Sequence, residues 1–150
     1  MSATHFSGPV MAGTLTTGQT NGPNQGFARL KQVANLTQNS TNAVSSTIYI
    51  PAGSRISSFD IDVLTAFDSA TSATLTIGTS AGDTTYVGSV DAKTAGRASI
   101  TFTAAQLAAM AGVTLTGSAS PTVPAVVVTI TPVGATTAGF VTVAINYMQQ

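Results

Sequence analysis

Few side chains in this 150-residue sequence could carry chemistry, and most of them stand far apart. The single histidine, His5, comes two residues before Ser7, which raises the possibility of a hydrolytic serine–histidine pair. A general base has to be held in position by its neighbours. We expect residues 1–26 to form an extended arm, which could not hold a histidine in place. We therefore interpret the spacing of His5 and Ser7 as coincidence.

The acidic residues are five aspartates, and glutamate is absent; the five are Asp60, Asp62, Asp68, Asp83 and Asp91. Asp60 and Asp62 alternate with apolar residues, so we expect them on the outer face of one strand, roughly 7 Å apart. Such a pair could share a calcium ion or act as acid and base. A catalytic acid also needs an apolar pocket to raise its pKa, and the outer face supplies none. We interpret both as solvated or interface-facing, and predict no metal, no cofactor and no enzymatic activity.

The basic residues are also five and are scattered: Arg29, Lys31, Arg55, Lys93 and Arg97. With 7% charged residues and zero net charge, the chain lacks the clustered cations that bind nucleic acid or an anionic membrane. We therefore predict neither partner. The cations are better interpreted as single anchors on a protein partner. In particular, Arg55 is a candidate for an ion pair with an aspartate, such as Asp60 or Asp62, of a neighbouring copy.

The composition favours strands as the elements that position these residues. Threonine is the most frequent residue and glutamate is missing, whereas helices favour glutamate and strands favour threonine and other β-branched residues. Cysteine is also absent, which excludes disulfides and thiolate ligands. We expect an all-β protein with a single domain.

Alternating apolar residues mark the expected strands. They lie at 47–50, 56–67, 74–79, 86–90, 98–102, near 126–131 and at about 139–148. Residues 27–38 fit either a short helix or a strand, and the β context favours the strand. Phe59, Ile61 and Val63 should point inward. The pattern predicts a single jelly-roll-like β-sandwich of about eight strands.

Two segments depart from this pattern. Thr103 and Gln106 have the spacing of a capping box, which predicts one short helix near 104–110. Residues 1–26 hold a dense Gly/Pro/Asn cluster and few apolar residues. We expect an arm plus first strand over 1–46 and a sandwich domain over 47–150.

Nothing near the first residue resembles a signal peptide, because no basic region precedes an apolar run. The densest apolar stretch, 125–130, is too short to cross a bilayer. We therefore expect synthesis in a cytoplasm.

Four segments together carry a resemblance to a known family. They are Phe-Ser-Gly-Pro-Val at 6–10, Ser-Thr-Ile-Tyr-Ile-Pro-Ala-Gly-Ser-Arg-Ile at 46–56, Thr-Ala-Phe at 65–67 with Leu-Thr-Ile-Gly-Thr at 75–79, and Ala-Gly-Phe-Val-Thr-Val-Ala-Ile-Asn-Tyr at 138–147. The chain resembles small structural proteins of tailed bacteriophages, especially capsid decoration or cement proteins.

The resemblance implies a structural protein on the exterior of a virion. It would bind the major capsid protein as a dimer or trimer, bridge neighbouring shell subunits and have no catalytic residues. The arm would make the contacts, through Phe6, Pro9, Val10, Met11, Leu15, Phe27 and Arg29. Extended arms of this kind order on their partners, and many weak contacts are multiplied by symmetry.

Two other functions stay open from the sequence. The first is a tail- or head-fibre module that binds a host surface glycan, with Tyr49 or Tyr86 as a stacking platform. The second is a small β-sandwich hydrolase, which the missing catalytic constellation disfavours.

Overall fold

The computed structural model describes residues 29–51, 54–111 and 125–149, which form eight strands and one helix. The elements are β1 (Arg29–Thr37), β2 (Val44–Tyr49), β3 (Ser54–Thr65), β4 (Ser72–Gly78), β5 (Val87–Asp91), β6 (Gly96–Arg97), α1 (Ala104–Ala111), β7 (Ala125–Val133) and β8 (Phe140–Gln149). The predicted arm lies outside the described residues, and so do its contact residues Phe6, Pro9, Val10, Met11, Leu15 and Phe27.

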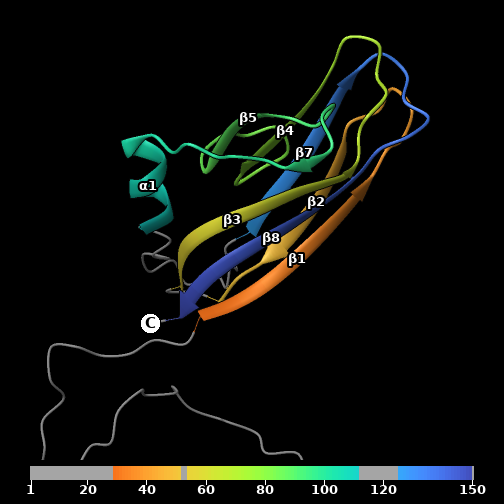
Figure 1. Cartoon of the computed structure of the whole chain (residues 1–150). Coiled ribbons are helices and arrows are strands. Elements are labelled where there is room, and N and C mark those ends of the chain that lie inside the picture. The colour runs from red at the N-terminus through yellow and green to blue at the C-terminus, as the bar shows by residue number, and fades with distance from the viewer. Residues whose placement is uncertain (1–28, 52–53, 112–124, 150) are drawn as a thin grey trace, which may run out of the picture.

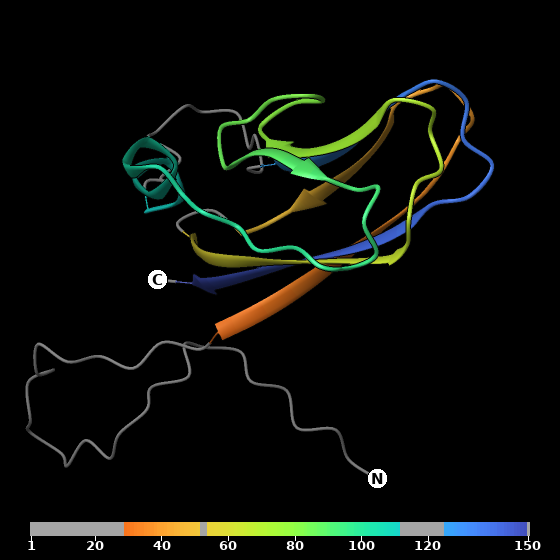
Figure 2. The ribbon, with the colours of Figure 1, turned by 45° about the horizontal axis from the view of Figure 1, so that its top comes forward.

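The strands form two antiparallel four-stranded sheets with the orders β1-β8-β3-β6 and β2-β7-β4-β5. The sheets face each other as two layers, with α1 at one end (Figures 1 and 2). β1 pairs with β8, β2 with β7, β3 with β6 and β4 with β5. This pairing is that of one long antiparallel ribbon wrapped into a jelly roll. The predicted all-β sandwich of jelly-roll-like type is confirmed.

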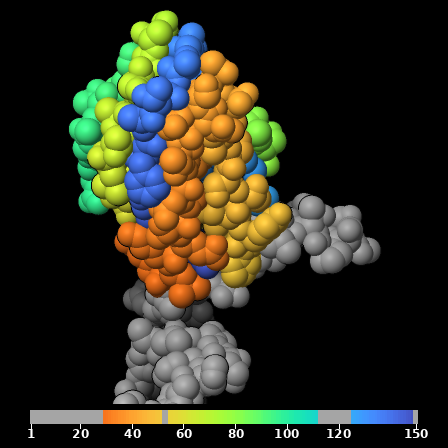
Figure 3. Space-filling model, turned by 90° about the vertical axis from the view of Figure 1, so that its right-hand side faces the viewer, coloured from red at the N-terminus to blue at the C-terminus, as the bar shows by residue number. Residues whose placement is uncertain are grey.

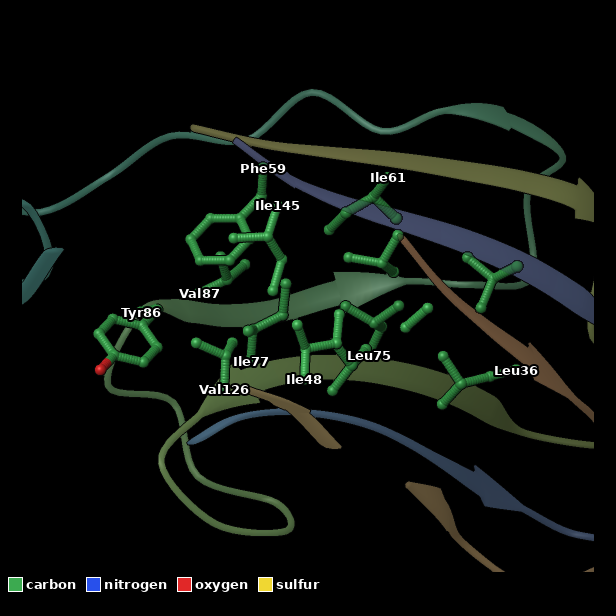
Figure 4. Close-up of a cluster of buried hydrophobic side chains, with 14 of the residues drawn as sticks. Leu36, Ile48, Phe59, Ile61, Leu75, Ile77, Tyr86, Val87, Val126 and Ile145 are labelled. Atoms are coloured by element: carbon green, nitrogen blue, oxygen red, sulfur yellow. The ribbon is translucent and has the colours of Figure 1, made fainter. Parts of the chain in front are cut away.

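The core fills the space between the two sheets. Phe59, Ile61 and Ile145 project into it from one sheet and Leu75 and Ile77 from the other (Figure 4). All five are at least 95% buried, and each buried side chain of this size contributes roughly 1.5–3 kcal/mol relative to an exposed one. The inward orientation predicted for Phe59, Ile61 and Val63 is therefore confirmed.

Local signals located most of the elements correctly. The segment that fitted both helix and strand is the strand β1, because β8 offers it a ladder partner along its whole length. The predicted helix is α1, and its capping box is formed. The backbone amide of Gln106 donates to Thr103 Oγ1 (3.2 Å), and the backbone amide of Thr103 donates to Gln106 Oε1 (2.9 Å). Met110 is the helix residue that joins the core.

One predicted strand is wrong. Residues 98–102 alternate between half-buried and exposed as a strand does, and Ala98, Ile100 and Phe102 pack against the core. The ladder with β3, however, is confined to Gly96 and Arg97, with one further bond from the Ala98 amide to the Ile61 carbonyl (2.9 Å). Alternation without a neighbouring strand gives an extended segment and no sheet.

The sandwich begins earlier in the chain than the expected division between 46 and 47. β1 pairs with β8 in nine register positions from Arg29 to Thr37. A division at 46/47 also cuts β2, whose residues from Val44 to Tyr49 pair with β7. The first strand is thus one edge of the sandwich, and the described sandwich starts at Arg29.

Candidate functional site

Most of the charged residues singled out from the sequence lie on the solvent-facing side of the β1-β8-β3-β6 sheet. We call this side the outer face. Residues opposite one another in a ladder share a side of the sheet. One row contains Lys31, Asn146 and Ser58, the next Val33, Ala144 and Asp60, and the third Asn35, Thr142, Asp62 and Arg97. Figure 3 shows β8 in blue between β1 in orange and β3 in yellow-green.

A β-bulge in β3 decides which side Arg55 occupies. The register shifts between Ile56 and Ser58, so one extra residue, Ser57, interrupts the alternation. Its hydroxyl donates to the Asn146 carbonyl oxygen at 3.0 Å. Ile56 and Phe59 are consequently both buried, although simple alternation would place them on opposite sides. Arg55 therefore lies on the outer face together with Asp60.

Asp62 and Arg97 form a two-pronged ion pair across β3 and β6. Arg97 donates from Nε to Oδ1 at 2.7 Å and from Nη2 to Oδ2 at 2.9 Å. The hydrogen bonds from Arg97 hold the pKa of Asp62 below its usual value, and the same contact raises the pKa of Arg97. A carboxylate in this state is a structural anion and a poor proton donor near neutral pH.

Asp60 is held by two neighbours on the outer face. The Asn146 amide nitrogen donates to Asp60 Oδ2 and to Ser58 Oγ, both at 3.0 Å. Lys31 Nζ lies 3.7 Å from the same Oδ2 atom. Both Asp60 and Asp62 thus have a cationic partner in their own chain. From the sequence we expect instead that such an aspartate pairs with Arg55 of a neighbouring copy.

Asp83 organises the loop that joins β4 and β5. Its carboxylate accepts hydrogen bonds from the amides of Thr79, Thr84 and Thr85 and from the hydroxyls of Thr79 and Thr85, at 2.7–3.2 Å. These bonds, that from the Thr79 amide foremost, hold the pKa of Asp83 far below its usual range. The loop also reaches β7, where the Gly82 amide donates to Thr129 Oγ1 (3.1 Å).

Asp68 and Asp91 have similar roles in two other loops. Asp68 accepts hydrogen bonds from the Thr137 hydroxyl (2.6 Å) and from the amides of Thr137 and Ala138 (2.8 and 3.0 Å). These bonds, led by the Thr137 hydroxyl, lower the pKa of Asp68 to about 2. Asp91 accepts from the Lys93 amide and the Thr94 hydroxyl, which also lower its pKa.

Arg29 and Arg55 differ from the other charged residues of the outer face because neither forms an ion pair with an aspartate. Arg29 on β1 and Arg55 on β3 both stand opposite Met148 of β8, so they form a fourth row at the end of the face. Both side chains are exposed. All five aspartates lie in the described part of the chain, where the ion pairs join Lys31 with Asp60 and Arg97 with Asp62. Neither Arg29 nor Arg55 therefore has an aspartate partner.

A shallow cavity of about 300 Å³ lies where β5 and β6 form the open edge of the sandwich. Its polar lining includes Asp91, Thr94 and Arg97. Asp91 and Thr94 are bonded to each other, and Arg97 is bonded to Asp62. These groups therefore already have partners.

The two tyrosines proposed as platforms for stacking on a sugar differ in their solvent exposure. Tyr49 on the edge strand β2 is 61% exposed and available to a partner. Tyr86 is 6% exposed, and its ring centroid lies 6.3 Å from that of Phe59 at the core. Tyr86 is therefore a core residue, and its expected role as a stacking platform is wrong.

Sequence reasoning identified the outer-face charges but missed the groups that hold them. Asn146 interrupts an apolar run at an outward position, which was a usable signal for a bridging side chain. The pairing of Asp62 with Arg97, 35 residues away, had no local signal. His5 and Ser7 lie outside the described residues.

Two properties of the described residues complete the site. They contain no group of three or more metal-ligating side chains. No helix among them has the length and apolar character needed to span a membrane.

Comparisons with protein-family models, curated proteins and solved structures gave no match.

Proposed function

We propose that this protein is a structural, non-enzymatic component of a phage virion that binds the outside of the capsid. It would contact the major capsid protein as a dimer or trimer and bridge neighbouring shell subunits. The motifs at 6–10, 46–56, 65–67 with 75–79, and 138–147, which resemble those of decoration proteins, supply the virion part of the proposal.

One structural observation supports the non-enzymatic part most directly. The five aspartates are the whole acidic inventory of the chain, and each accepts hydrogen bonds or an ion pair that fixes a loop or joins strands. Four of them, Asp62, Asp68, Asp83 and Asp91, have lowered pKa values. A general acid requires a raised pKa. These four aspartates are therefore better suited to holding loops and strands in place than to acid catalysis.

The test is the copy number of this chain in purified virions, measured by quantitative mass spectrometry against the major capsid protein. A ratio near one, or a simple fraction set by icosahedral symmetry, is expected. A handful of copies per virion would move the protein to a vertex, tail or fibre. Complete absence from virions would overturn the proposal.

A tail- or head-fibre module that binds a host surface glycan is the second candidate. The exposed ring of Tyr49 favours it, because sugars stack on accessible aromatic faces. A glycan array with the native protein and with Tyr49→Ala distinguishes the two functions. Binding that disappears in Tyr49→Ala would favour the fibre module, and an array without hits would remove it.

A further inference from the structure

Three cations gather at one end of the outer face, next to the point where residues 1–28 join β1. Arg29 and Arg55 flank Met148 in one row, and Lys31 lies in the adjacent row on β1. Because neighbouring Cα atoms across antiparallel strands are about 4.5–5.5 Å apart, the Cα atoms of the two arginines are about 10 Å apart. Two exposed arginine side chains whose Cα atoms are that far apart can reach one partner surface laid over Met148.

The charges at this end are only partly neutralised. Lys31 is 3.7 Å from Asp60, at the long end of an ion pair. Arg29 and Arg55 have no aspartate partner, whereas Arg97 is doubly bonded to Asp62 and Lys93 donates to the Thr71 carbonyl oxygen (3.3 Å). A protein with zero net charge thus places two exposed arginines, both without an aspartate partner, in one row of the outer face.

The engaged aspartates indicate what kind of partner fits. A second copy of this chain brings only aspartates that already accept hydrogen bonds within their own chain, so it is a poorer source of carboxylate than a protein with an unbonded acidic patch. Nucleic acid is also disfavoured, because strong phosphate binding relies on more cations, roughly 6–10. Arginine matches the planar carboxylate with paired hydrogen bonds.

We propose that Arg29, Arg55 and Lys31, around Met148, form a docking surface for an acidic patch on a different protein. This inference rests on the proposed function and names the surface through which the sandwich would meet its shell partner. The contact would be individually weak, because exposed ion pairs contribute only about 0.2–1 kcal/mol. Repetition over a symmetric shell would multiply it.

The test is an NMR titration of the full chain with an octaglutamate peptide. The Met148 methyl and the Asn146 amide report on the docking surface, and the methyl is assigned with Met148→Leu. We expect both signals to shift with peptide. Arg29→Gln and Arg55→Gln should each raise the apparent Kd about two- to fivefold. Lys93→Gln, which removes one charge elsewhere, should leave the Kd unchanged.

Several outcomes would overturn the proposal. The first is a Met148 methyl signal that does not shift at millimolar octaglutamate. The second is an equal rise of the Kd for octaglutamate in Lys93→Gln and in Arg55→Gln. Tighter binding of oligothymidylate or of phosphatidylserine vesicles at the same signals would also reject an acidic protein as the partner.

The titration involves no virion, so its failure is distinct from failure of the proposed function. Octaglutamate binding by a chain that is absent from virions would reject the capsid role and keep the docking surface. A chain present at shell copy number that does not bind octaglutamate would keep the capsid role and reject this surface.

Discussion

The carboxylate of Asp83 lies directly against Gly78, at the point where the chain leaves β4. A Cβ atom on Gly78 would overlap Asp83 Oδ2, well inside van der Waals contact. Glycine at 78 thus makes room for the carboxylate that collects the amides and hydroxyls of the following loop. The two residues form one unit, with one supplying space and the other supplying hydrogen-bond acceptors.

Gly78→Ala should therefore destabilise the fold by about 1–3 kcal/mol, the usual cost of overpacking a close contact. Urea unfolding followed by circular dichroism measures it. Gly88→Ala is the matched control, because its new Cβ would be 3.7 Å from its nearest neighbour, the Gln106 amide nitrogen. Equal unfolding midpoints for the two variants would contradict the proposed coupling of Gly78 and Asp83.

Acid should destabilise the protein through its loop aspartates. The folded-state pKa of Asp68 is about 2, below the value of about 3.9 for an unfolded aspartate. Its contribution is therefore complete above about pH 4 and is lost as the pH falls towards the folded pKa. Urea midpoints measured between pH 6 and pH 2.5 should decline with acid.

Thr137→Val isolates the Asp68 contribution, because it removes the hydroxyl donor 2.6 Å from the carboxylate and keeps the carboxyl group. We expect a lower midpoint at neutral pH and a shallower loss below pH 4. Thr131→Val changes an exposed threonine of β7 and should leave the acid slope as it is. An unchanged slope in Thr137→Val would show that Asp68 is not responsible.

The capping box should govern the first turn of α1. Thr103→Ala removes the acceptor of the Gln106 amide and should cost about 1 kcal/mol, the typical value for a lost N-cap. Hydrogen exchange of the Leu107 amide, which donates to the Thr103 carbonyl, should accelerate. Thr103→Ser retains the hydroxyl and should exchange like the native protein; equal acceleration in both variants would contradict the role of the cap.

Deletion of residues 1–26 tests the predicted arm separately from the sandwich. The described sandwich starts at Arg29, and β1 finds its ladder partners in β8, so the truncated chain should keep the native urea midpoint. If the arm contacts the capsid through Phe6, Val10 and Leu15, the truncated protein should no longer co-sediment with capsids. Replacing these three residues by serine in the full chain is the matched control for length, and capsid binding by both variants would contradict the arm hypothesis.

Local sequence signals were sufficient for much of the architecture. Alternation at Phe59, Ile61 and Val63 predicted the buried side of β3, because successive strand residues point to opposite faces. The Thr103 and Gln106 spacing predicted α1, because a capping box is formed within four residues. Both signals depend only on neighbours along the chain, so the sequence contains them in full.

Tertiary structure alone decided the rest, because strand pairing joins residues that are distant in sequence. The bulge at Ser57 placed Arg55 on the outer face, and the β3–β6 register gave Asp62 its arginine. Residues 98–102 alternate as a strand does, yet apart from the bond between the Ala98 amide and the Ile61 carbonyl they have no ladder partner among the described residues. Alternation along each strand was enough to predict which side chains are buried in most strands. The ladder partners determined which charges meet, since hydrogen-bond register is set between strands and not within them.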